Sequence, residues 1–275
     1  MNFLIFFIYT FSLPRSIILM SVLFSIIKEW KQQFAELLKL PELTIKDGLI
    51  LQLKYKNENN KFHRNIDIGP AVIQYNENKQ IYCEYYLVND KRHRHTKDGP
   101  AYVRYFENGQ IEYEQYWVND KKHRPLEEGP AVIKYNENGQ PKYEEYWING
   151  KIHRPIEEGP AEICYFENRQ ISYEEYWVNG EKHRPLKEGP ACVRYYKNGH
   201  IEYKQYWING KIHRPTKEGP ACINYYENGQ VSCEEYWTYG KIHRPLEEGP
   251  AIINYYENGK IDYGKYWVNG NYYIS

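Results

Sequence analysis

The chain has 275 residues, and its 36 basic and 36 acidic side chains give a formal net charge of zero at pH 7. Balanced charge argues against a nucleic-acid partner, which calls for a basic face, and against strong attraction to anionic lipid. Thirty tyrosines and seven tryptophans describe an aromatic-rich chain, in which rings that each bury roughly 150–250 Å² compensate for a thin core.

Residues 1–27 differ from the rest, because they hold sixteen Leu, Ile, Val or Phe and a single charge, Arg15. Two interpretations stand. The segment is a membrane anchor, and the lysines that follow it place the remaining chain in the cytosol; or translation starts at Met20. A signal peptide fits less well, since no Lys or Arg precedes the apolar run and no small-x-small cleavage site follows it.

Residues 28–43 are predicted to form an amphipathic capping helix that ends before Pro41, because an array of repeats needs a cap. The apolar face of this helix begins at Leu23 and Ile27 and continues through Trp30 and Phe34. Residues 44–61 then read as a degenerate first hairpin, with Asn59-Asn60 in the turn.

From residue 62 to residue 275 the sequence repeats every 30 residues, in seven units without insertion or deletion. A His-Arg pair and a Gly-Pro-Ala segment return in each unit, beginning with His63 and Gly69. Such regularity predicts a linear array in which each unit contacts only its neighbours.

The first strand of a unit is predicted at residues 131–135, where apolar residues alternate with variable ones. Asn-Gly in the following segment 136–140 predicts a hairpin with a type I′ turn. Lys79 and Arg169 replace this Gly in two units, so their turns are expected to be strained or of another type.

The second strand is predicted at residues 111–119, with Tyr113 and Trp117 on one face. Gln115 then falls on that apolar side, which suggests a bulge or an edge position. A second turn follows at Asn149-Gly150, and Pro155 is expected to take the chain out of the sheet. We therefore expect an all-β, elongated antiparallel β-meander array with an N-terminal helix. A β-propeller blade would need four strands and about 40–45 residues.

The segments "YEEYWINGKIHR" and "GPAEICYFENR" resemble an enlarged MORN repeat, and more closely the "NGK-x-HR…GPA" repeat proteins of giant viruses and phages. The unit of 30 residues is longer than the 23-residue MORN unit, and Glu or Gln replaces the Gly between the aromatic residues. The resemblance covers residues 62–275 and implies an elongated sheet that serves as a scaffold or a partner-binding module.

The His-Arg pairs invite a catalytic or metal-binding interpretation, which the spacing opposes. Neighbouring units would place their histidines roughly 9–10 Å apart, too far to share one metal ion. No Ser, Thr or Cys recurs in register as a nucleophile. We therefore predict no catalytic residue, no metal and no cofactor, and assign structural roles to the pairs and to the glycines that follow them. These residues are His123, Arg124, His153, Arg154, His183, Arg184, His213, Arg214, Gly129, Gly159, Gly189 and Gly219.

Within this structural interpretation, Arg154 pairs with Glu157, Glu158 or a Glu of a neighbouring unit. His153 hydrogen-bonds backbone groups left free where Pro155 interrupts the ladder.

The tryptophans recur at the same spacing and are candidate binding residues: Trp117, Trp147, Trp177, Trp207, Trp237 and Trp267. A stripe of this kind is more often core. Exposed, it would form an aromatic groove for glycans or quaternary amines.

Five cysteines without a pairing pattern predict free thiols in a reducing compartment, the cytoplasm. The function expected is a non-enzymatic scaffold that binds a protein partner; the alternative is the aromatic-groove ligand binder. Because the fold does not fix the variable strand positions, they are the expected presentation surface. These positions are Val132, Glu162, Cys192, Cys222, Lys134, Cys164, Arg194 and Asn224.

Overall fold

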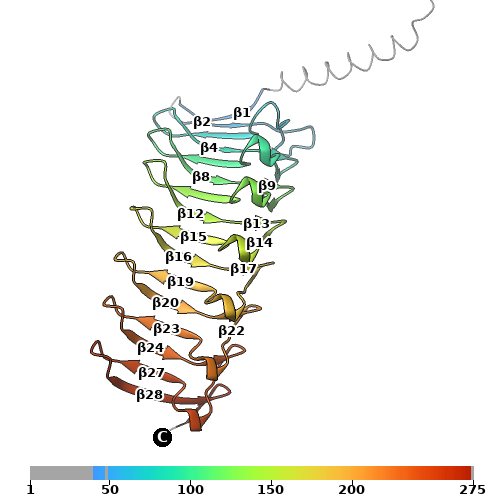
Figure 1. The fold of residues 1–275 in the computed structure, drawn as a ribbon. Helices are drawn as coiled ribbons and strands as arrows, with labels where there is room; N and C mark the ends of the chain where they lie inside the picture. Colours follow the sequence, from blue (N-terminus) through green and yellow to red (C-terminus); the bar gives the residue numbers. More distant parts are fainter. Residues whose placement is uncertain (1–39, 47–48, 274–275) are drawn as a thin grey trace, which may run out of the picture.

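The computed structural model describes residues 40–46 and 49–273, which form one 17-stranded antiparallel sheet with its main strands in chain order (Figure 1). The helices in this stretch of the chain are single turns of 3₁₀-helix, and it contains no α-helix. No helix among the described residues is long and apolar enough to cross a membrane. The predicted membrane segment lies outside the described residues. So does the predicted capping helix up to residue 39; its last residues, Glu42 and Leu43, belong to a strand.

The main strands come in pairs, one hairpin to a unit, and each hairpin pairs with the next. A first hairpin, β1 (Glu42–Lys46) and β2 (Leu49–Lys54), precedes the complete units. The paired strands that follow are β3 (Val72–Tyr75) and β4 (Ile81–Tyr85), β7 (Tyr102–Tyr105) and β8 (Ile111–Gln115), β11 (Val132–Tyr135) and β12 (Pro141–Glu145), β15 (Glu162–Tyr165) and β16 (Ile171–Glu175), β19 (Cys192–Tyr195) and β20 (Ile201–Gln205), β23 (Cys222–Tyr225) and β24 (Val231–Glu235), and β27 (Ile252–Tyr255) and β28 (Ile261–Val268).

A short hairpin and one turn of 3₁₀-helix connect each unit to the next along one side of the sheet (Figure 1). The short hairpins are β5 (Leu87–Val88) with β6 (Lys91–Arg92), β9 (Trp117–Val118) with β10 (Lys121–Lys122), β13 (Trp147–Ile148) with β14 (Lys151–Ile152), β17 (Trp177–Val178) with β18 (Glu181–Lys182), β21 (Trp207–Ile208) with β22 (Lys211–Ile212), and β25 (Trp237–Thr238) with β26 (Lys241–Ile242). The 3₁₀ turns are η1 (Thr96–Asp98), η2 (Leu126–Glu128), η3 (Ile156–Glu158), η4 (Leu186–Glu188), η5 (Thr216–Glu218) and η6 (Leu246–Glu248). In the last unit β28 runs on to pair with β29 (Asn271–Tyr273).

The turn between the main strands is not the type I′ turn predicted from Asn-Gly. Only Gly139 has a positive φ there, +77°, and its N–H donates to the carbonyl of Asn136. This is a type I turn followed by one left-handed residue, and a shift of register after Lys134 accompanies it. Lys79 and Arg169 hold the same place with φ of +63° and +70°, so these units keep the turn and carry its strain.

The second turn lies at Asn149-Gly150, as predicted, and it is this turn that is type I′: Asn149 and Gly150 have φ of +52° and +84°. Beyond it, Pro155 starts the 3₁₀ turn η3, where the N–H of Glu158 donates to its carbonyl. The chain therefore leaves the sheet where the proline was expected to break the ladder.

One face of the sheet carries a tightly buried apolar row in each unit. Ala131 is fully buried, and Ile133 and Tyr116 are 8% and 6% exposed. Tyr135 lies on the same face and donates its hydroxyl hydrogen to Glu114 of the preceding unit at 2.9 Å. Five units are joined to the preceding one in this way, by side chains as well as by the ladder.

An arginine closes the return from each short hairpin to the sheet. The guanidinium of Arg214 lies 4.2 Å from the ring centre of Tyr206, and its Nη1 donates to the carbonyl of Pro220 at 3.2 Å. Gly219 lies beside it with φ of +117° and ψ of −172°, a region that only glycine adopts readily. A Cβ there would stand 3.1 Å from Nη1. We call this arrangement the arginine clamp; it recurs in all seven units.

The clamp predicts which glycines the fold requires. Gly219→Ala should lower the free energy of unfolding by about 1–3 kcal/mol, because the backbone is strained and the methyl group crowds Arg214. Gly139→Ala is the matched control: a Cβ at Gly139 meets nothing within 4 Å, and other units place Lys or Arg there. Gly139→Ala should lower the free energy of unfolding by less, roughly 1 kcal/mol. Urea denaturation of the two variants measures both values, and equal losses would contradict the role of the clamp.

Candidate functional site

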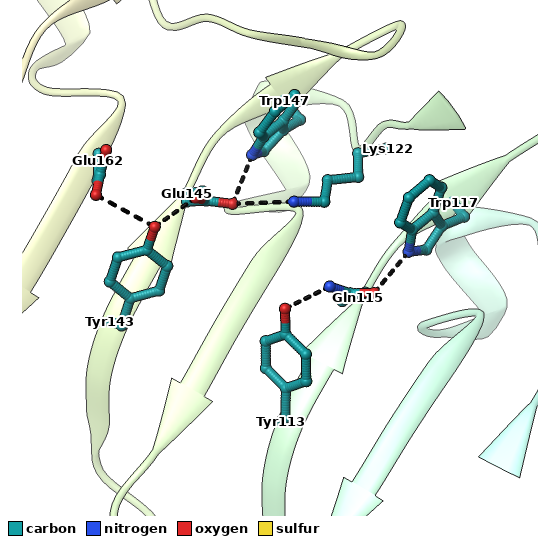
Figure 2. A network of polar contacts seen from close by, with 8 residues as sticks. All are labelled: Tyr113, Gln115, Trp117, Lys122, Tyr143, Glu145, Trp147 and Glu162. Carbon is teal, nitrogen blue, oxygen red and sulfur yellow. Dashed lines mark hydrogen bonds and ion pairs between the residues drawn. The ribbon is translucent and has the colours of Figure 1, made fainter. Parts of the chain in front are cut away.

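The opposite face of the sheet, which we call the tryptophan face, carries a polar and aromatic network. In one unit, Gln115 accepts the indole N–H of Trp117 at 3.0 Å and donates its amide to the hydroxyl of Tyr113 (Figure 2). Gln115 pairs regularly with Val132 and Tyr102, so the bulge or edge predicted there is wrong. A polar residue occupies this face because Trp and Tyr need a partner for their polar atoms.

Glu145 holds the same place in the next unit and gathers three side chains around its carboxylate (Figure 2). It accepts hydrogen bonds from the hydroxyl of Tyr143 and, at 2.7 Å, from the indole of Trp147. Lys122 of the preceding short hairpin lies 3.4 Å from the same carboxylate and 4.3 Å from the Trp147 ring centre. Tyr143 also reaches Glu162 at 3.2 Å.

The six candidate tryptophans all lie on this face and are half-buried. Five donate their indole N–H to Gln or Glu two residues earlier, at 2.7–3.1 Å, and these are Trp117, Trp147, Trp177, Trp207 and Trp237. Trp267 makes no such bond, since Lys265 stands in the acceptor's place.

Side-chain cations of the protein itself lie over several of these indole rings. Arg92 is 4.7 Å from the ring centre of Trp117. Lys182 lies between two rings, 5.2 Å from Trp177 and 5.0 Å from Trp207. In these units the indole rings therefore already make cation–π contacts with side chains of the protein itself, the kind of contact that was expected for a ligand.

Three carboxylates form a row across neighbouring strands of the tryptophan face. Glu162 of β15 pairs with Glu145 on one side and Glu175 on the other. Like charges directly opposite one another repel, and burial adds to this effect. Desolvation first, then the charges of Glu175 and Glu145, raise the pKa of Glu162 to about 7. Glu175 itself is 2% exposed and forms an ion pair with Lys182.

Three of the eight positions of the expected presentation surface are buried. Val132 and Cys192 are 1% exposed and Cys222 is 4% exposed, because Tyr and Trp side chains of neighbouring strands share their face. Lys134 and Arg194 are exposed as expected, and Glu162, Cys164 and Asn224 are half-buried. The positions whose residue varies from unit to unit therefore include both buried and exposed side chains on this face.

The cysteines are unpaired, and Cys83, Cys192 and Cys222 are buried. The Cys192 thiol lies 3.5 Å from the Tyr173 hydroxyl and 3.6 Å from that of Tyr203. Burial raises the pKa of Cys192 and of Cys164 to about 11, which keeps both as thiols, poor nucleophiles at neutral pH.

The histidines of the His-Arg pairs connect consecutive units. Nδ1 of His153 accepts the backbone N–H of Asn179, in the type I′ turn of the next unit, at 3.2 Å. His123, His183 and His213 make the equivalent bond at 3.2–3.4 Å. The prediction that His153 bonds to backbone groups left free at Pro155 is therefore wrong, because its partner lies in the turn of the next unit.

The arginines of the pairs form clamps. Arg154 lies 4.0 Å from the Tyr146 ring centre and donates to Pro160 O at 3.1 Å, beside Gly159. Arg124 and Arg184 are held in the same way beside Gly129 and Gly189. Among the ion pairs of the described residues, none joins Arg154 to Glu157 or Glu158. The same residues include no group of His, Cys, Asp or Glu arranged to hold a metal ion.

No family model matches the chain, and no curated protein matches it. Among solved structures, alternansucrase in complex with isomaltononaose is similar at 15% identity, over 85% of this chain and 14% of that chain. The TM-score is 0.21, so the likeness carries no argument about fold or ligand.

The carboxylate row predicts a pH dependence of stability. The pKa of Glu162 is raised from 4.5 to about 7 in the folded protein. The contribution of this carboxyl group to the free energy of unfolding is therefore fully present below pH 4.5 and is lost as the pH rises through 7. Glu162→Gln removes the group that must ionise. The melting temperature of the variant relative to the unchanged protein should therefore be higher at pH 8 than at pH 5.

Glu127→Gln, which alters an exposed carboxylate of η2, is the matched control. Thermal denaturation followed by circular dichroism at several pH values gives the comparison. A Glu162→Gln profile parallel to that of the unchanged protein would show that the row does not shift this carboxyl group.

Proposed function

We propose that the protein is a non-enzymatic scaffold, a MORN-like β-repeat array that binds a protein partner on the tryptophan face. The observation that carries this proposal is that the recurring side chains are engaged within the array. The histidines hold the next unit's turn, the arginines form clamps, and the tryptophans bond to Glu or Gln. Groups used in this way build a rigid support.

The side chains that differ from unit to unit offer a surface for recognition. Lys134 is exposed, with Nζ 4.7 Å from the Tyr143 ring centre, and exposed Arg194 lies 5.2 Å from that of Tyr203. Two units separate them, or roughly 19 Å at the usual strand spacing. Cations resting on aromatic rings, at a fixed separation, suit a partner surface that carries carboxylates.

Charge reversal on the tryptophan face tests the proposal. The double variant Lys134→Glu/Arg194→Glu should lose partners that the unchanged chain captures from an extract of its source cells. The matched control, Lys121→Glu/Lys151→Glu, makes the same charge change at the exposed first residues of β10 and β14 in the short hairpins and should retain these partners. Quantitative mass spectrometry of the captured proteins is the readout. Loss of the same proteins in both variants, or in neither, would contradict recognition by this face.

A ligand-binding face would give a different result in the same samples. Titration with choline and with maltotriose, followed by tryptophan fluorescence, should leave the emission unchanged, because indole N–H groups and ring faces already have partners within the chain. A saturable change that Trp147→Phe abolishes would favour the aromatic groove over the scaffold.

A further inference from the structure

The two end strands of the sheet each have an outer edge to which no described strand pairs. At one end, β1 pairs only with β2. At the other, residues 261–265 of β28 pair only with β27. Large apolar side chains are exposed at both ends: Leu43 and Ile45 at 50% and 58%, and Ile261 and Tyr263 at 62% and 45%. Unpaired edges of this kind accept a further strand readily.

The directions of the two edges are complementary. Throughout the sheet, the second strand of one hairpin pairs antiparallel with the first strand of the next, as β24 does with β27. β28 is a second strand and β1 is a first strand. A β1 strand placed beside β28 would therefore repeat this junction of a second strand with a first strand. Two copies of β28 related by a two-fold axis would also be antiparallel, but they would not repeat it.

The register of the internal units assigns the residues that would meet. β24 pairs Glu235 with Ile252, and Ile252 also pairs with Lys265 in its own hairpin. In β1, Glu42 pairs with Lys54 of its hairpin in the place that Ile252 holds. At a junction with the internal register, Lys265 of one copy therefore faces Glu42 of the next. Opposite charges directly across a ladder are favourable.

The backbone groups on the two edges also correspond. The carbonyl of Lys265 is used within its own hairpin, where it accepts the Ala251 N–H, so the polar groups of Gly264 and Tyr266 lie on the outer edge, where Tyr266 is also paired with Tyr273 of β29. The internal junction uses the Tyr236 N–H and the Ala251 carbonyl. Pro41 holds the place of Ala251 in β1, and a proline keeps the carbonyl that this bond requires.

The apolar face of the junction is matched as well. At five junctions within the array a tyrosine hydroxyl donates to a glutamate of the preceding unit, as Tyr255 does to Glu234 at 2.9 Å. Gly264 holds the place of that glutamate and Ile45 the place of that tyrosine. Neither a carboxylate nor a hydroxyl would lose its partner where these two residues meet.

We propose that the outer edge of β28 binds the outer edge of β1 of a second copy of this chain, so that copies join head to tail into one continuous sheet. Such an interface uses different surfaces on the two partners and does not close on itself, so it generates filaments. The proposal goes beyond the scaffold function, since it concerns the ends of the array and not the tryptophan face.

Sedimentation velocity of the full chain over a range of concentrations tests the proposal. The unchanged protein should form oligomers that grow with concentration. Lys265→Glu, and separately Glu42→Lys, should each weaken association by on the order of tenfold, because a favourable cross-strand pair becomes a repulsive one. Lys260→Glu, which changes an exposed turn residue of the same unit by the same charge, should associate like the unchanged protein.

Mixing the two single variants is the decisive arm of the experiment. Each end of one variant then meets a complementary end of the other, so association should return to the level of the unchanged protein. Circular dichroism confirms that both variants fold, which matters for Glu42→Lys because Glu42 also pairs with Lys56 at 2.9 Å. A monomer at all concentrations, association insensitive to the charge reversals, or no recovery on mixing would each overturn the proposal.

Discussion

The structure depends on the arginine clamp, because this contact fixes how the chain returns to the sheet after each short hairpin. A guanidinium lies flat on a tyrosine ring, donates to a proline carbonyl and passes close to a glycine, as Arg154 does with Tyr146, Pro160 and Gly159. Planar guanidinium groups suit both stacking and directed hydrogen bonds. With the return path constant, every unit presents its strands in the same register to the next.

Contacts between units follow from that constant register. The histidine of one unit accepts a backbone N–H of the next unit's turn, and in five units a tyrosine donates to a glutamate of the preceding unit. Polar side chains that would suggest catalysis in a globular enzyme thus serve a quasi-one-dimensional architecture, whose stability comes from nearest-neighbour terms. The aromatic rings supply much of the buried surface that a single-layer sheet otherwise lacks.

The period, the meander, the turn at Asn149-Gly150 and the bend at Pro155 could be predicted because each follows from local sequence. The turn containing Gly139 could not, because its left-handed residue is set by the register of the flanking strands. Burial of Val132 and Cys192 also escaped prediction, since it arises from rings on neighbouring strands. Nor does charge pattern alone reveal that Arg154 binds a tyrosine ring and a carbonyl instead of a carboxylate.

The most direct test of this account is a double-mutant cycle on Tyr146 and Arg154, with Tyr146→Leu, Arg154→Met and the double variant compared by urea denaturation. The clamp predicts a coupling energy of about 0.5–2 kcal/mol, the range of a partly desolvated cation–π contact. Additive losses in the double variant would show that the two side chains do not stabilise one another, and would contradict the clamp as the basis of the repeat.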